Sequence, residues 1–248
     1  TEIGSRLVGS EMCIRDIFTN PKKRVFILYL FLSILIAAGW LILHKKKSLK
    51  ESIKFIFNPK VFFSKSATSD YKVFFINQVI MLLISPHLLT QITIATALYF
   101  FFFEISFLDM GLFATTPKYI IISLFTLTHF IVDDFSKYIV HRWMHRWPFL
   151  WALHKVHHSA TNLTPMTVFR THPLEGLVFT LRSAFAQGLT ISTFVYFFAG
   201  GVDLYTVLGA NLFVFLFNVF GSNLRHSHIG IRYWKWLEYI LILSLIHI

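Results

Sequence analysis

Histidines are concentrated in one short part of the chain, at spacings that suit metal binding. Residues 134–175 contain six of the twelve histidines. Two of these lie four residues apart, and three more lie at positions i, i+3 and i+4, so each set shares one face of an α-helix. Neutral imidazole is a good ligand for iron, zinc and copper. The pattern predicts a metal site with the ligands His141, His145, His154, His157 and His158, and with His172 as a further candidate.

A second group of candidate ligands lies far downstream, in the segment SNLRHSHIG. His226 and His228 are two residues apart and therefore do not share a helix face, although a loop can bring them together. We include both among the candidate metal ligands. Asn223, three residues before His226, is a candidate supporting residue.

Other polar residues near the histidines suit a supporting role. Asp134 and Tyr138 lie seven and three residues before His141, so all three can share one helix face. A group that accepts the second N–H of a ligating imidazole fixes its tautomer. The alternative for Asp134 is an ion pair with a nearby lysine or arginine. Besides Asp134, Tyr138 and Asn223, we assign the supporting role to Arg170 and Glu175.

The number of histidines bears on the kind of metal site. Eight candidate ligands exceed the four of a structural zinc site, and two metal ions with a histidine-rich set of ligands fit better. A zinc ion with three histidines and one open position remains an alternative, which leaves most of the set unexplained. A carboxylate-bridged di-iron bundle needs Glu-x-x-His pairs, which this segment lacks.

Composition places these residues in a membrane protein. Of the 248 residues, 55% are hydrophobic and only 14% are charged, with a mean hydropathy of +0.62. A soluble domain has roughly 25% charged residues. The net charge of +11 comes from lysines clustered between apolar runs, which is typical of the cytoplasmic flanks of membrane spans. The chain is therefore predicted to be an integral membrane protein that does not bind nucleic acid.

The apolar runs predict an all-α, polytopic fold with about four to six transmembrane helices. A basic segment, 44–72, is expected at the cytoplasmic interface, and an acidic loop, 104–117, outside. Ser85-Pro86-His87 interrupts the second run, which is either one kinked span or a tight hairpin; the acidic loop favours a single crossing. This arrangement puts the histidine-rich di-metal site on the cytoplasmic face. The five predicted spans are 25–43, 73–103, 118–140, 174–199 and 202–220.

Tryptophans accompany the histidines. Trp143, Trp147 and Trp151 repeat every four residues. Amphipathic indole rings are enriched where a membrane meets water, so we interpret the three as an interfacial aromatic belt. A platform for a substrate is the alternative.

The two ends of the chain differ in character from the rest. Residues 1–16, which include the only cysteine, Cys13, have no helical or strand period, and we expect them to be a non-native or disordered leader. Residues 243–248 are expected to be a non-native tail, because both ends resemble translated adaptor sequence.

Three motifs resemble those of a known family. They are DFxxYxxHRxxH (134–145), LWxxHxxHHS (150–159) and RxHPxE (170–175), and together with the segment near His226 they are similar to the fatty acid hydroxylase/sterol desaturase superfamily of integral membrane di-iron oxygenases. The resemblance covers roughly residues 131–239. His141, His145, His154, His157 and His158 match the family's ligand boxes, and His226 matches the next. Family members continue with a last HxxHH box that this chain lacks.

The resemblance implies a function. Members hold two iron ions on the cytoplasmic face and use O2 to hydroxylate or desaturate a C–H bond of a lipid, either fatty acyl or sterol-like. The electrons come from a separate reductase, cytochrome or ferredoxin-type donor. We expect residues 17–130 to supply N-terminal spans and the basic interfacial segment, and residues 131–242 to form a C-terminally truncated hydroxylase-like domain in a bacterial inner membrane.

Other functions remain open from the residues alone. A zinc-dependent membrane hydrolase, or another histidine-rich metal-binding membrane protein, fits the same ligand types. A transporter is disfavoured, because its ligands would lie within the spans near the midplane of the bilayer, whereas these histidines lie just outside the spans.

Overall fold

The computed structural model describes residues 18–19, 25–84, 88–105, 107, 109–199 and 228–229, and the regular secondary structure within these ranges is helical. The predicted all-α fold is confirmed. Two compact units are present: Thr1–Pro86 with Met144–Gly176 and Phe215–Ile248, and His87–Trp143 with Leu177–Val214. The predicted non-native ends, 1–16 and 243–248, lie outside the described residues.

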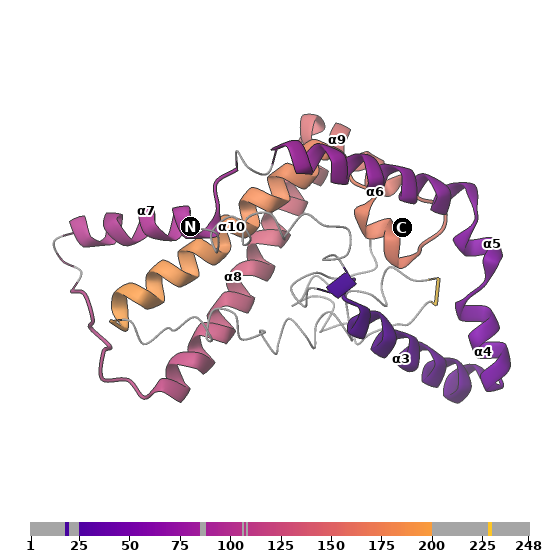
Figure 1. Cartoon of the computed structure of the whole chain (residues 1–248), viewed down its shortest axis with the longest axis horizontal. Helices are drawn as coiled ribbons and strands as arrows, with labels where there is room; N and C mark the ends of the chain where they lie inside the picture. Colours follow the sequence, from indigo (N-terminus) through magenta and orange to yellow (C-terminus); the bar gives the residue numbers. More distant parts are fainter. Residues whose placement is uncertain are drawn as a thin grey trace. The chain divides into compact units, whose positions relative to one another are not determined.

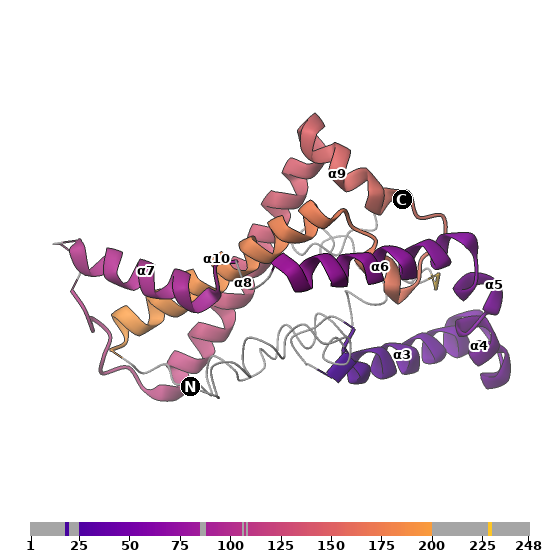
Figure 2. The same ribbon diagram turned by 45° about the horizontal axis from the view of Figure 1, so that its top comes forward.

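Between residues 25 and 84 the first unit contains four successive helices, α3 (Ile27–Lys45), α4 (Leu49–Ile56), α5 (Pro59–Phe62) and α6 (Lys65–Ile84) (Figure 1). Figure 2 shows α3 and α4 side by side, and Ala37, Leu41 and Ile56 form the buried contact between them. In the capping box at the start of α4, Ser48 Oγ accepts a hydrogen bond from the backbone N–H of Glu51, and the backbone N–H of Ser48 donates to the carboxylate of Glu51. The hydroxyl of Ser48 donates to the same carboxylate. These hydrogen bonds lower the pKa of Glu51.

The helix boundaries differ from the prediction in this region. The basic interfacial segment was expected to reach Lys72 and a single span to run from Val73 to Phe103. Instead, α6 already begins at Lys65, and the apolar run is divided between α6 and a separate helix, α7 (Gln91–Glu104). The division falls around Pro86, a residue type that cannot donate a backbone hydrogen bond within a helix.

The histidine motifs lie on helices. His141 and His145 are in the last part of α8 (Lys118–Arg146), and the next three histidines are in α9 (Pro148–His158). Proline disfavours helical geometry in the residue before it, and Trp147 is accordingly extended, so α8 ends just before it. A short 3-10 helix, η3 (Pro165–Phe169), then leads to α10 (Pro173–Phe197).

The second unit contains α7 and most of α8 and α10. Arg182 of α10 forms an ion pair with Asp133 of α8 at 2.9 Å, and Asp133 also pairs with Lys137. Phe125 and Phe194 pack edge to face between the same two helices. At the other end of α10, the backbone of residues 196 and 197 accepts hydrogen bonds from residues 111 and 113. α8 and α10 are thus joined by an ion pair and by a ring contact, and the segment before α8 is bonded to the end of α10.

Three of the described helices, α3, α6 and α8, are long and apolar enough to cross a membrane. The chain is therefore an all-α membrane protein. The predicted span 174–199 forms the helix α10 but is not among these three; it carries Arg182 and Gln187. The predicted span 202–220 lies outside the described residues.

Candidate metal centre

Three histidines of the first unit meet where α8 ends and α9 runs. The ring centroids of His145 and His154 are 4.8 Å apart, those of His145 and His158 are 4.9 Å apart, and those of His154 and His158 are 4.8 Å apart. The Nε2 atoms of His154 and His158 lie 3.1 Å from each other. Two imidazole nitrogens from successive turns of α9 therefore point to one place, beside a ring from α8.

His141 lies one turn before His145 in α8, so the continuous helix fixes the relation between them. The ligand atoms of His141 and His145 are within 4.8 Å of each other, as are those of His145 and His154. Within the described ranges, His141, His145 and His154 form a group that can hold a metal ion.

A buried carboxylate orients His154. Both side chains are only 2% exposed, and His154 Nδ1 lies 2.8 Å from Glu175 Oε1 at the start of α10. Because a carboxylate accepts, this contact puts a proton on Nδ1, and in the neutral ring Nε2 then keeps its lone pair, as a metal ligand requires. Glu175 Oε2 is buried and makes no hydrogen bond with any described residue. This donor set, imidazoles with a buried and incompletely paired carboxylate, fits a cation.

An aromatic ring covers the cluster. The Trp151 ring lies 5.4 Å from that of His145 and 5.5 Å from that of His158. Trp151 precedes His154 by three residues and His158 by seven, so all three occupy one face of α9. Trp151 was predicted to belong to an interfacial belt. Its spacing of three and seven residues from His154 and His158 also indicates the contact with these histidines.

The chain is similar in sequence to proteins of a known family. Residues 126–248, about half of the chain, match the fatty acid hydroxylase family. A 72-residue segment is 38% identical to a Delta(7)-sterol 5(6)-desaturase of Eremothecium gossypii, and this match covers 29% of the chain and 20% of the desaturase. This part of the chain belongs to the fatty acid hydroxylase/sterol desaturase superfamily. No solved structure shows a significant match to the chain.

The resemblance drawn from the histidine motifs is therefore confirmed at the level of the superfamily. The match includes all of the candidate ligands, from His141 to His228. The chain aligns with only a fifth of the length of the curated sterol desaturase.

The structure places the other candidate ligands differently. His157 stacks on His154, with ring centroids 5.6 Å apart, and so lies beside the cluster. His172 Nδ1 accepts a hydrogen bond from the backbone N–H of Leu174 at the start of α10. His228 Nε2 donates to the carbonyl oxygen of Phe55, 2.9 Å away, and its ring packs against that of Phe55. His226 and Asn223 lie outside the described residues.

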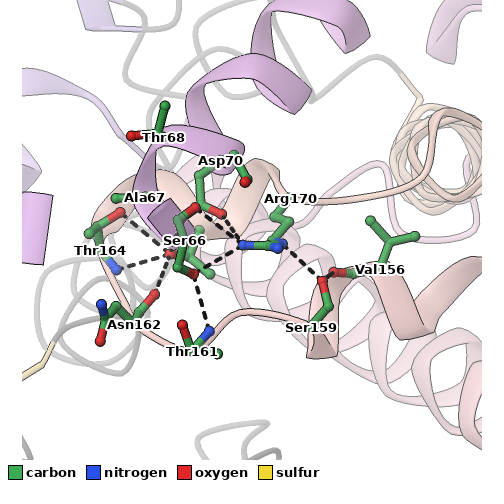
Figure 3. A network of polar contacts seen from close by, with 12 residues as sticks. Ser66, Ala67, Thr68, Asp70, Val156, Ser159, Thr161, Asn162, Thr164 and Arg170 are labelled. Atoms are coloured by element: carbon green, nitrogen blue, oxygen red, sulfur yellow. Dashed lines mark hydrogen bonds and ion pairs between the residues drawn. The ribbon is translucent and has the colours of Figure 1, made fainter. Parts of the chain in front are cut away.

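The candidate supporting residues also have distinct positions. The hydroxyl of Tyr138 accepts a hydrogen bond from Arg142 Nη1 at 2.8 Å. Asp134 lies on α8 and is half-buried. Arg170 pairs with Asp70 of α6, at 3.0 Å, and contacts the segment that follows α9 (Figure 3). Asp70 was not predicted as a supporting residue, because its partner Arg170 is distant in the sequence.

Proposed function

We propose that the chain is an oxygen-dependent membrane oxidoreductase that holds two iron ions and hydroxylates or desaturates a C–H bond of a fatty acyl or sterol-like lipid. The superfamily supports this reaction class. The observation that carries the proposal is the buried His154, which Glu175 holds at Nδ1 while its Nε2 faces His158. We assign the activity to residues 131–242, with the spans and basic segment of residues 17–130 as its membrane support.

Each of the eight candidate ligands has a proposed part in this site. His154 and His158 act as ligands from α9, and His141 and His145 from α8. Two metal ions need more ligands than the described cluster provides. We propose that the remaining ones come from His157, His172, His226 and His228. Asp134, Tyr138, Arg170, Glu175 and Asn223 are proposed to orient the ligands of the whole site.

The reaction needs a bound metal, because no side chain is a strong enough oxidant to break an unactivated C–H bond; iron supplies that capacity. Hydroxylation consumes the lipid, O2, two electrons and two protons, and yields the alcohol and one water. Desaturation consumes the same reagents and yields the alkene and two waters. A separate reductase, cytochrome or ferredoxin-type donor supplies the electrons. The protein positions the lipid, which enters from the bilayer, and Trp151 limits access to the histidines from one side.

Metal content is the measurement that tests this proposal. We expect the full chain, produced with added iron and purified in detergent, to contain about two iron ions per chain, as the ligand number suggests. His154→Ala and His158→Ala should each lose most of this iron while still inserting into the membrane. The matched control is His44→Ala in α3, an exposed histidine that is not among the candidate ligands and whose ring packs on Trp40, and it should keep the iron.

The alternatives have different outcomes. One zinc ion and no iron would favour a zinc-dependent membrane hydrolase, which the three imidazoles of His141, His145 and His154 also suit. A folded wild-type chain without metal would contradict the metal centre altogether. Iron in the wild type should be accompanied by hydroxylated or unsaturated lipids in the membranes that contain it, and these can be detected by mass spectrometry against His154→Ala membranes.

A further inference from the structure

One face of α6 contacts the segment that links the histidine helix to α10. Ser66, Asp70, Phe74 and Asn77 are spaced by four, four and three residues, so they form a single stripe along the helix. The first three are buried, and Asp70 is completely so. The linking segment, residues 159–172, follows the last histidine of α9 and precedes Glu175 by only a few residues.

Every residue of the stripe contacts this linking segment. Ser66 Oγ accepts a hydrogen bond from the backbone of Thr161 at 3.1 Å, and Asp70 Oδ2 accepts one from the hydroxyl of Thr167 at 2.7 Å. The Phe74 and Phe169 rings are 5.1 Å apart. Asn77 Nδ2 donates to the carbonyl oxygen of Thr171 at 2.8 Å.

Arg170 joins α6 to the end of the histidine helix (Figure 3). Its Nη1 donates to Asp70 Oδ1 at 3.0 Å and to Ser66 Oγ at 3.1 Å. Its Nε donates to Ser159 Oγ at 3.1 Å. The hydroxyl of Ser159 in turn donates to the carbonyl oxygen of Val156 at 2.7 Å, in the last turn of α9. A continuous chain of polar contacts therefore runs from Asp70 to the turn of α9 that carries His157 and His158.

The opposite end of the linking segment leads to Glu175. Asn77 holds the backbone of Thr171, four residues before the carboxylate that orients His154. The stripe on α6 thus contacts both ends of a segment whose flanks carry His158 on one side and Glu175 on the other. Movement of this segment relative to α6 would change the separation of the two groups.

We propose that Asp70 is a positioning residue of the metal centre: it holds Arg170, which holds Ser159 and so sets the position of His158 relative to the Glu175-oriented His154. This inference rests on the proposed metal-binding function. We assign this role to Asp70 because its side chain is completely buried and pairs with Arg170, whose side chain is only 12% exposed. Loss of its charge leaves a nearly buried guanidinium without its ion pair, and Arg170 then has no fixed position from which to hold Ser159.

Cobalt(II) is the probe for this proposal, because its visible absorption reports the geometry of its ligands. We expect Asp70→Asn in the full chain to change the cobalt spectrum and to weaken cobalt binding at least tenfold, as is usual when residues that orient ligands are lost. The matched control is Asp133→Asn, which removes another carboxylate paired with an arginine, Arg182, in the other unit. It should lower the melting temperature but leave the cobalt spectrum of the folded protein unchanged.

A second variant covers the case in which Asp70→Asn does not fold. Arg170→Lys keeps a positive charge near Asp70 but lacks the Nε–H that reaches Ser159. It should therefore change the spectrum with little loss of thermal stability. If both folded variants have the wild-type spectrum and cobalt affinity, the positioning role is wrong although the metal centre stands. A wild-type chain that binds no cobalt contradicts the proposed function, and this inference with it.

Discussion

His154 and Glu175 form a pair that is almost entirely removed from water, with Nδ1 and Oε1 2.8 Å apart. A carboxylate in such a place costs several kcal/mol unless it is paired and hydrogen-bonded. The imidazole satisfies one oxygen, whereas Oε2 has no hydrogen-bond partner among the described residues. A cation held by His154 Nε2 would place positive charge on the far side of the ring and so compensate the carboxylate. The proposed metal would therefore supply the energetic reason for this pair.

Glu175→Gln tests that relation. The amide can still accept a hydrogen bond from Nδ1, but it carries no charge, so we expect metal binding to weaken roughly ten- to hundredfold. Competition with a chelator of known affinity measures the change. The metal-free variant should be as stable as the metal-free wild type or more so, because an uncompensated buried charge has been removed.

The control for this variant is Glu104→Gln, at the exposed end of α7, which should leave metal binding unchanged. An unchanged affinity in Glu175→Gln would show that the carboxylate has no part in the site.

Distance along the sequence decided which residues of the site could be predicted. The histidines of α8 and α9 were identified because a helix converts spacings of three and four residues into proximity. Glu175 was identified from its place in a motif, although its contact with His154 spans 21 residues. The pairing of Asp70 with Arg170 spans 100 residues, and no local pattern indicates it. From the sequence alone, Asp70 is therefore only an acidic residue within the basic segment 44–72.

At the scale of the helices, close approach depends on small residues. Gly188 of α10 faces α7, where an added Cβ would lie 2.8 Å from Ile94 Cγ2 and 3.0 Å from the carbonyl oxygen of Gln91. Local sequence patterns predicted that residues 174–199 form a helix, but not this contact. The sequence favoured one kinked span over a hairpin for residues 73–103, and a proline indicates an interruption without specifying the path of the chain.

Gly188→Ala should therefore separate α7 from α10. The added methyl group overpacks the contact, which costs about 1–3 kcal/mol. The higher helix propensity of alanine offsets about 1 kcal/mol of this cost. We expect a lower midpoint of thermal unfolding in detergent. Gly39→Ala in α3 is the control, because a Cβ there meets nothing within 4 Å and should not lower the midpoint. Equal midpoints for the two variants would mean that α7 and α10 do not need this approach.

At the scale of the whole molecule, the first unit brings the lysine-rich segment and the histidines to the same end of α6. The first turns of α6 directly follow α4 and α5, and they are bonded to the segment that follows α9. The positive-inside tendency of the sequence predicts the same grouping. The structure adds hydrogen bonds between α6 and the segment that follows α9.

Single cysteines in a Cys13→Ser background test the sidedness. We expect Lys50→Cys in α4 and Lys155→Cys in α9 to react with a membrane-impermeant maleimide only from the cytoplasmic side. Thr115→Cys, before α8, should react only from outside, since a helix of 29 residues is about 43 Å long and can cross the bilayer once. Labelling of Lys50→Cys and Lys155→Cys from opposite sides would contradict the shared face.

The ion pair between Asp70 and Arg170 also sets an order of events during synthesis. A ribosome that adds about 5–20 residues per second needs about 5–20 s to travel the 100 residues from one partner to the other. During that interval α6 carries an acidic side chain whose arginine does not yet exist. The last turn of α9 can be fixed only after Arg170 has left the ribosome, by which time every histidine of α8 and α9 has been made. Capture of the proposed metal by a half-finished set of imidazoles would thereby be disfavoured, and its loading would belong to the late stage of biogenesis.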